Sequence, residues 1–154
     1  MRVVFLDIDG PMIPSGQYLI NPLCSFERQF PAIPIAVMNT LCKKSGAKIV
    51  FNTTHNKSFP DVPDVEHCLW RQGLKEEHVV TGVYKTLYPE LDRETAVSEW
   101  LARHPDVTEW VAFDDARFTE KENLIWVDPD TGLTPFHLNE ALEFFGCPPY
   151  LIYV

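Results

Sequence analysis

Positive charge is scarce in this sequence of 154 residues, which carries 13 Lys and Arg against 22 Asp and Glu, a formal net charge of −9 at pH 7. A broad surface for a nucleic-acid backbone needs clustered Lys and Arg, so we expect no extended nucleic-acid binding surface, although a single phosphorylated end could still dock. Long hydrophobic runs are absent as well. No stretch approaches the length of a membrane-spanning helix, and the first apolar run is too short for the core of a signal peptide. We therefore expect a cytoplasmic protein with no membrane partner.

Cysteine is also sparse. The four cysteines, Cys24, Cys42, Cys68 and Cys147, are far apart and form no C-x-x-C pair, which predicts reduced, structural thiols. Low-complexity segments and internal repeats are missing, and a hydrophobic fraction of 45% excludes disordered and collagen-like chains. The length fits one domain over residues 1–154.

Predicted strands and helices alternate along the chain. The strands are short apolar runs at residues 3–6, 47–51, 78–81, 110–113 and 124–127. The helices between them begin or end at capping residues, and they cover residues 34–44, 61 or 64 to 72, 92–101 and 134–146. This order predicts an α/β protein with a three-layer Rossmann-like fold and a mostly parallel five-stranded sheet, whose ligand site lies at the carboxyl ends of the strands. Residues 11–30, rich in proline and polar residues, are expected to form a flap over the end of the first strand.

Two acidic residues end the first predicted strand. Asp7 and Asp9 flank Ile8, and Gly10 follows at once. Residues two apart in an extended chain point to the same side, so the two carboxyl groups should converge. Like charges at that distance are unfavourable unless a cation or a shared proton relieves them. A divalent metal beside a reacting phosphate is the simplest interpretation, although D-x-D-G alone is often only a turn.

Polar residues also follow the second and fourth predicted strands. Thr53 and Thr54 come after the second strand, and Asp114 and Asp115 come after the fourth. In a parallel sheet these groups reach the same edge as the first pair of aspartates. The hydroxyls could instead only cap the turn that follows them.

Two candidate cations, Lys85 and Arg93, lie between these motifs. Carboxylates, hydroxyls and one cation suit phosphoryl transfer, because carboxylates hold Mg²⁺, metal and cation neutralise phosphate charge, and a hydroxyl orients a phosphate oxygen. The carboxylates available to hold Mg²⁺ are Asp7, Asp9, Asp114 and Asp115.

With these motifs the sequence resembles the haloacid dehalogenase-like (HAD) phosphohydrolase superfamily, recognised by D-x-D-G, a strand ending in Ser or Thr, a Lys or Arg, and a late acidic pair. Residues 100–105, 113–115 and 128–134 look similar to the small HAD domains associated with RNA-repair proteins. The resemblance covers nearly the whole chain. It implies a Mg²⁺-dependent phosphatase that works through an aspartyl-phosphate.

Carried over to this sequence, the resemblance makes Asp7 the nucleophile and Asp9 the general acid, which later serves as the base that activates water. Asp114 and Asp115 correspond to the metal-binding pair, with Asp115 bound directly or through water. Nearby Mg²⁺ favours the ionised nucleophile, while Asp9 sits far enough from the metal to exchange a proton.

The remaining positions hold the phosphate. Thr53 resembles the phosphate-binding hydroxyl, and Thr54 is the adjacent alternative. Arg93 stands where the family usually carries its basic residue, just before a helix, and is preferred to Lys85, which lies in an earlier loop. His55 follows the hydroxyl pair and is a candidate for substrate contact.

The resemblance also bears on the substrate. Many HAD enzymes select small metabolites with an inserted cap domain, and neither interval that could hold one is long enough here, so we expect a capless, open site. The resemblance to RNA-repair domains implies a nucleotide or a nucleic-acid terminal phosphate as substrate. The alternatives are a phosphoprotein phosphatase, a catalytically silent module that binds a phosphorylated partner, and a receiver-like switch. A receiver is disfavoured because its phosphorylated aspartate lies on a middle strand.

Overall fold

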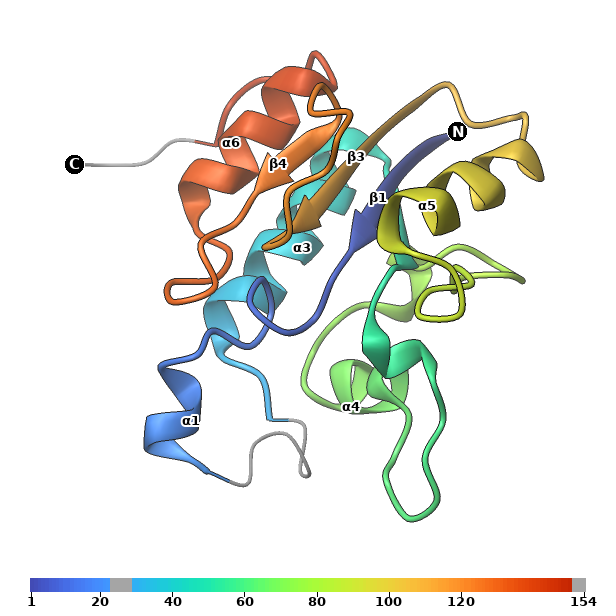
Figure 1. Cartoon of the computed structure of the whole chain (residues 1–154). Coiled ribbons are helices and arrows are strands. Elements are labelled where there is room, and N and C mark those ends of the chain that lie inside the picture. The colour runs from blue at the N-terminus through green and yellow to red at the C-terminus, as the bar shows by residue number, and fades with distance from the viewer. Residues whose placement is uncertain (23–28, 151–154) are drawn as a thin grey trace.

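The computed structural model describes residues 1–22 and 29–150 (Figure 1). Its sheet has four parallel strands in the order β2-β1-β3-β4. The strands are β1 (Arg2–Leu6), β2 (Lys48–Phe51), β3 (Glu109–Asp114) and β4 (Leu124–Trp126). The α/β fold and the parallel sheet predicted from the sequence are confirmed, in keeping with a HAD Rossmann-like architecture.

Helices cover both faces of the sheet, which gives the three expected layers (Figure 1). Along β1, Val4 and Leu6 pack with helices α3 (Ala32–Ser45) and α6 (Pro135–Phe144), whereas Val3 and Phe5 pack with α5 (Arg93–Ala102). Alternate residues of a strand point to opposite faces, so a strand buried on both sides must be apolar throughout. Residues 3–6 are accordingly 0% exposed.

Most helix boundaries follow from capping residues. Helix α3 ends at Gly46, which has a φ of 73°, a left-handed conformation that glycine adopts easily. Asp92 caps α5 by accepting a hydrogen bond from the Thr95 N–H, and Thr134 precedes Pro135 in a capping box at the start of α6. The shorter helices in the described ranges are α1 (Gln17–Ile20), α4 (Val65–Arg71), and the 3₁₀ turns η1 (Thr54–Asn56) and η2 (Glu76–His78).

The predicted strand at residues 78–81 is wrong. His78 ends the 3₁₀ turn η2, and Val79 makes only an isolated bridge to Ile49 on the outer edge of β2. Gly82, with a φ of 94°, then lies in a bend of the chain, which returns to β2 where Lys85 bridges Phe51. The edge of β2 is therefore covered by an irregular segment, and the sheet has four strands instead of five.

The first part of the predicted flap is packed firmly. Met12 and Ile13 are fully buried, and the flap is tied to residues 128–133, which include the turn that precedes α6. The Ser15 N–H donates to the carbonyl of Pro129 at 2.8 Å, and the Leu133 N–H donates to that of Pro11 at 2.8 Å. The flap residues 23–28, with Cys24, lie outside the described residues.

The described part of the interval between β1 and β2 holds α1 and α3, and the interval between β2 and α5 holds α4 and the turns η1 and η2. Every helix in those ranges is too short or too polar to cross a membrane. Cys42, Cys68 and Cys147 are free thiols, and burial raises the pKa of Cys42 to about 12.

Candidate active site

Three carboxylates converge at the carboxyl end of the sheet. Asp7 directly follows β1, Asp114 ends β3, and Asp115 is the next residue. The parallel register places Leu6 beside Phe113, and the Asp7 N–H donates to the Phe113 carbonyl at 3.0 Å. Each of the three aspartates offers an oxygen within 4.8 Å of the others, and Asp7 and Asp114 are only 2% and 1% exposed. This is an oxygen-rich group of the kind that Mg²⁺ prefers.

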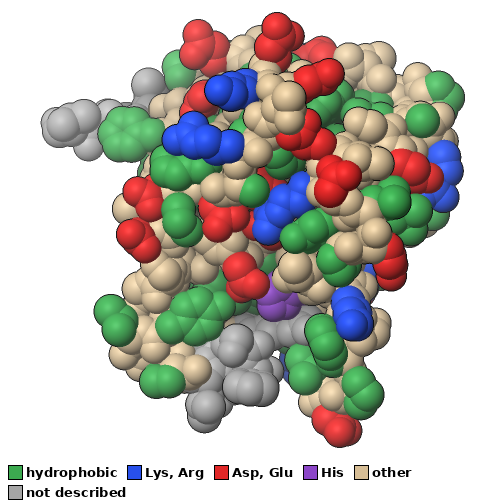
Figure 2. Space-filling view, in the orientation of Figure 1, with side chains coloured by type: hydrophobic (Ala, Val, Ile, Leu, Met, Phe, Trp, Pro, Cys, Tyr) green, Lys and Arg blue, Asp and Glu red, His purple; other side chains and the backbone are tan. Residues whose placement is uncertain are grey.

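Arg93 fills the point where these carboxylates meet. Its Nη1 lies 2.8 Å from Asp7 Oδ2, 2.5 Å from Asp114 Oδ1 and 3.8 Å from Asp115 Oδ1. Arg93 is the first residue of α5, where a positive charge opposes the helix dipole, so its position depends on the three acids in front of it. Figure 2 shows basic side-chain atoms flanked by acidic ones near the middle of this face.

The structure separates the two candidate cations. Lys85 Nζ lies 3.0 Å from Glu66 Oε1, and Glu66 is 2% exposed. The Tyr84 hydroxyl also donates to Glu66, at 3.2 Å. Lys85 therefore neutralises a buried carboxylate on α4, whereas Arg93 is the cation that contacts the three aspartates.

Among the described residues, a single guanidinium, that of Arg93, faces the three carboxylates, so their charge is not balanced there. Burial, followed by repulsion from Asp114, raises the pKa of Asp7 to about 8, although Arg93 opposes the rise. Burial also raises the pKa of Asp114, again against the effect of Arg93. A further positive charge would favour the ionised form of both groups.

Asp9 lies in a different environment. Ile8, fully buried, separates it from Asp7, and the Asp9 side chain is 50% exposed. Asp9 is not part of the three-carboxylate group. Its Oδ2 lies 3.0 Å from His55 Nε2, and its Oδ1 accepts a hydrogen bond from the Tyr18 hydroxyl at 3.1 Å.

The two threonines after β2 also differ. Thr53 is fully buried and caps η1, with its Oγ1 accepting from the His55 N–H at 3.3 Å, whereas Thr54 is exposed. Asn52 beside them accepts a hydrogen bond from the Thr86 hydroxyl at 2.7 Å. Thr53 thus lies at the same sheet edge as Asp7, one strand away.

Gly10 allows the chain to turn close to the acids. Its φ is 97°, and a Cβ atom there would lie 3.0 to 3.1 Å from the side chain of Asp115. A side chain at this position would collide with a candidate metal ligand, so the glycine of D-x-D-G has a direct role in the geometry.

The arrangement on this edge can be compared with known families. Residues 3–138 match the family described as "HAD domain in Swiss Army Knife RNA repair proteins". The chain belongs to this family. No curated protein and no solved structure matched. This match confirms the HAD-like domain that the order of the motifs predicted, and it supports a HAD-type phosphohydrolase at the level of the superfamily.

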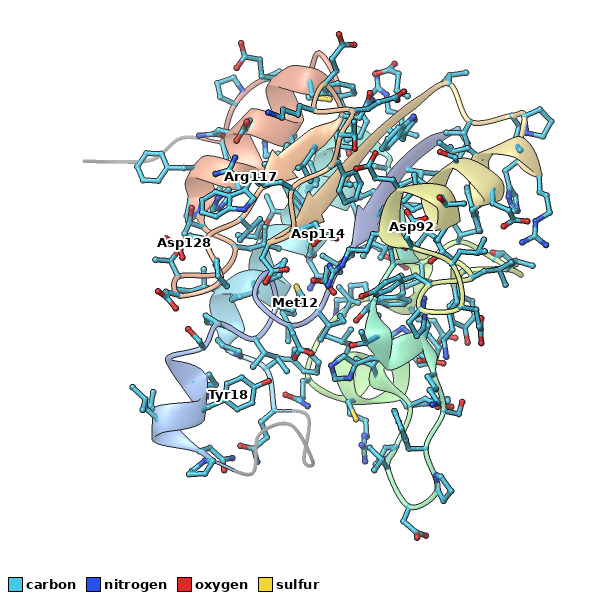
Figure 3. The ribbon with its side chains drawn as sticks, viewed as in Figure 1. Met12, Tyr18, Asp92, Asp114, Arg117 and Asp128 are labelled. Carbon is cyan, nitrogen blue, oxygen red and sulfur yellow. The ribbon has the colours of Figure 1, made fainter. Side chains whose placement is uncertain are left out.

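Sequence reasoning missed one residue of this HAD domain site. Tyr18 lies in the flap, where no periodicity marks it, and only the fold brings it to Asp9. The sequence clue to this contact was the position of Tyr18 in a segment expected to cover the end of the first strand. Figure 3 shows Asp114 near the middle of the molecule and Tyr18 on α1 at its lower side.

Proposed function

We propose that this HAD domain is a Mg²⁺-dependent phosphomonoester hydrolase that forms an aspartyl-phosphate on Asp7. The observation that carries the proposal is the contrast between two neighbouring aspartates. Asp7 is buried against Asp114 and Arg93, while Asp9 is half exposed and bonded to His55 and Tyr18. A nucleophile and a proton-transfer group need such different environments.

The donor set fits a divalent metal. Asp7, Asp114 and Asp115 would hold Mg²⁺ through their oxygens, and the raised pKa of the buried Asp7 supports a site that takes a further positive charge besides Arg93. Bound there, Mg²⁺ supplies charge neutralisation for the carboxylates and for a substrate phosphate. Arg93 and the Thr53 hydroxyl would then hold phosphate oxygens.

The reaction takes two steps. An oxygen of Asp7 attacks phosphorus, the bond to the leaving oxygen breaks, and Asp9 gives its proton to that oxygen. In the second step Asp9, now ionised, takes a proton from water, and the water oxygen attacks the phosphorus of the aspartyl-phosphate. The bond between the Asp7 oxygen and phosphorus breaks, which frees the Asp7 carboxylate and inorganic phosphate. Each step uses Asp9 in the protonation state that the other leaves behind.

We propose a nucleotide or a nucleic-acid terminal phosphate as substrate. The family description names RNA-repair proteins, and the described intervals hold no cap that would restrict the site to small metabolites. A net charge of −9 favours docking of a short end over a long duplex. A phosphoprotein substrate and a silent phosphate-binding module are the alternatives that the experiment separates.

The test is phosphate release in Mg²⁺ from nucleotides, from oligonucleotides with a 3′- or 5′-phosphate, and from a phosphopeptide. We expect release from the nucleotide substrates and loss of at least about 10³-fold in Asp7→Asn, because the nucleophile is removed. Asp106→Asn is the matched control, since Asp106 is exposed at the opposite, amino edge of the sheet. Binding of phosphate without turnover would instead establish a silent module, and activity confined to the peptide would overturn the substrate class.

A further inference from the structure

The carboxyl group of Asp9 is held at both oxygens. The Tyr18 hydroxyl reaches Oδ1 at 3.1 Å, and His55 Nε2 reaches Oδ2 at 3.0 Å. Two contacts on opposite oxygens define the plane of a carboxyl group as well as its direction. Each such contact restricts the rotamers that a half-exposed side chain can occupy.

His55 is itself placed by a braced turn. It belongs to η1, its backbone N–H donates to Thr53 Oγ1, and its side chain is only 11% exposed. The Asn56 side-chain amide donates to the carbonyls of Phe51 at 3.0 Å and Thr86 at 3.3 Å, which ties η1 to β2 and its edge segment. Thr53, which is proposed to hold phosphate, and His55, which contacts Asp9, therefore belong to the same turn.

Tyr18 comes from the other side of the site. It lies on α1, which follows the flap residues tied to residues 128–133 (Figure 3). Tyr18 and His55 thus come from separate parts of the chain, one after β1 and one after β2. Neither contact is a by-product of a single local turn.

We propose that His55 and Tyr18 are positioning residues that hold Asp9 in line with the leaving oxygen of the substrate. The inference rests on the proposed function, in which Asp9 changes its protonation state in each step. An imidazole N–H and a phenol hydroxyl can both donate to a carboxyl group whether it is ionised or protonated, because each form keeps acceptor oxygens, and the proton of the acid form then stays available for the leaving oxygen. Both contacts can therefore persist through the cycle, so that Asp9 keeps its position while it loses and regains its proton.

A comparison of substrates with good and poor leaving groups can detect such a positioning role. Phosphate transfer from p-nitrophenyl phosphate needs little proton donation, because nitrophenolate is a good leaving group, whereas a nucleoside monophosphate expels an alkoxide that needs the proton. A misplaced Asp9 should therefore lower kcat/KM for the nucleotide far more than for the nitrophenyl ester. A general collapse of the site would lower both alike.

The experiment measures kcat/KM for both substrates, and product inhibition by inorganic phosphate, in His55→Ala, His55→Gln and Tyr18→Phe. We expect His55→Ala to lose about 10- to 100-fold on the nucleotide and less than about 3-fold on the nitrophenyl ester, with phosphate inhibition unchanged. His55→Gln should recover part of the loss by restoring a hydrogen bond. His67→Ala, an exposed histidine on α4, is the matched control and should change neither value.

The outcomes separate the inference from the function on which it rests. Equal losses on both substrates, or no loss in any variant, would overturn the positioning role while leaving the phosphatase intact. No turnover by the native protein on any substrate would overturn the proposed function and this role with it. Tyr18→Phe removes only one hydroxyl, so it keeps the test decisive if His55→Ala does not fold.

Discussion

Replacing Asp7 with Asn should stabilise the metal-free protein while abolishing activity. The Asp7 carboxyl is 2% exposed and faces Asp114, and its pKa rises from 3.8 to about 8 for these reasons. Because the folded state holds this proton more tightly than the unfolded state, the free energy of unfolding falls as the pH rises from about 4 to about 8. One pKa unit corresponds to about 1.4 kcal/mol, so the ionisable Asp7 costs on the order of 4 kcal/mol at pH 7.

The substitution removes that cost, since Asn carries no charge in either state. Structural relaxation and water penetration reduce the cost of buried charge in folded proteins, so we expect a gain of about 2 to 4 kcal/mol at pH 7. The native protein should lose stability as the pH rises from about 4 to about 8, and the free energy of unfolding of the variant should depend less on pH. The assay is urea unfolding in a metal chelator, followed by tryptophan fluorescence at several pH values.

Saturating Mg²⁺ should reduce the difference, because a bound cation favours the ionised native site and stabilises the folded state by mass action. Asp106→Asn serves as control and should be neutral within about 0.5 kcal/mol, as exposed substitutions usually are. A metal-free Asp7→Asn protein that is no more stable than the native protein at pH 7 would refute the argument that the buried Asp7 carboxyl group lowers the free energy of unfolding.

Three further predictions concern buried groups and close contacts outside the three-carboxylate group. Lys85→Ala should lower the free energy of unfolding in urea by about 3 kcal/mol, because it leaves the buried Glu66 without the Lys85 ammonium. Adding Glu66→Gln should restore stability, and an unchanged urea midpoint in Lys85→Ala would contradict this pairing. Gly132→Ala should cost about 2 kcal/mol, since its Cβ would lie 3.0 Å from the Pro11 carbonyl oxygen and 3.2 Å from that of Gly10. Gly146→Ala is the control, because Gly146 has a similar φ but open space around it, and equal losses in the two variants would contradict the steric argument. Cys42 should resist alkylation in the folded protein, as shown by peptide mapping, because burial raises the pKa of its thiol to about 12; rapid labelling would show that this face of α3 opens.

Much of the fold was accessible from the sequence because its signals are local. Apolar runs between capping residues located four of the strands and most helix ends, including Gly46 and Asp92. Residues 78–81 were misassigned because Val79 and Val80 favour a strand locally, while the structure allows only an isolated bridge to β2 before the bend at Gly82.

The candidate site likewise contains features that the sequence could predict and features that depend on tertiary contacts. The meeting of Asp7 with Asp114 could be predicted, since parallel strands bring their carboxyl ends to one edge. The choice between Arg93 and Lys85 could not be settled, because it depends on Glu66, a residue that looks like any exposed helical acid in the sequence. The catalytic roles of Asp7, Asp9 and Thr53 stay predictions that kinetics must test.

The place of β1 in the sheet has a consequence for how the protein is made. The strand that precedes Asp7 pairs with β2 on one side and with residues 109–113 on the other, more than a hundred residues later in the chain. Contacts of such separation form slowly, because a long loop must close first. During synthesis the carboxylate of Asp7 therefore waits until β3 has left the ribosome before it meets Asp114. A nascent chain that ends before residue 109 holds D-x-D-G without its acidic partners, so the same topology that assembles the site also delays its assembly until the sheet is nearly complete.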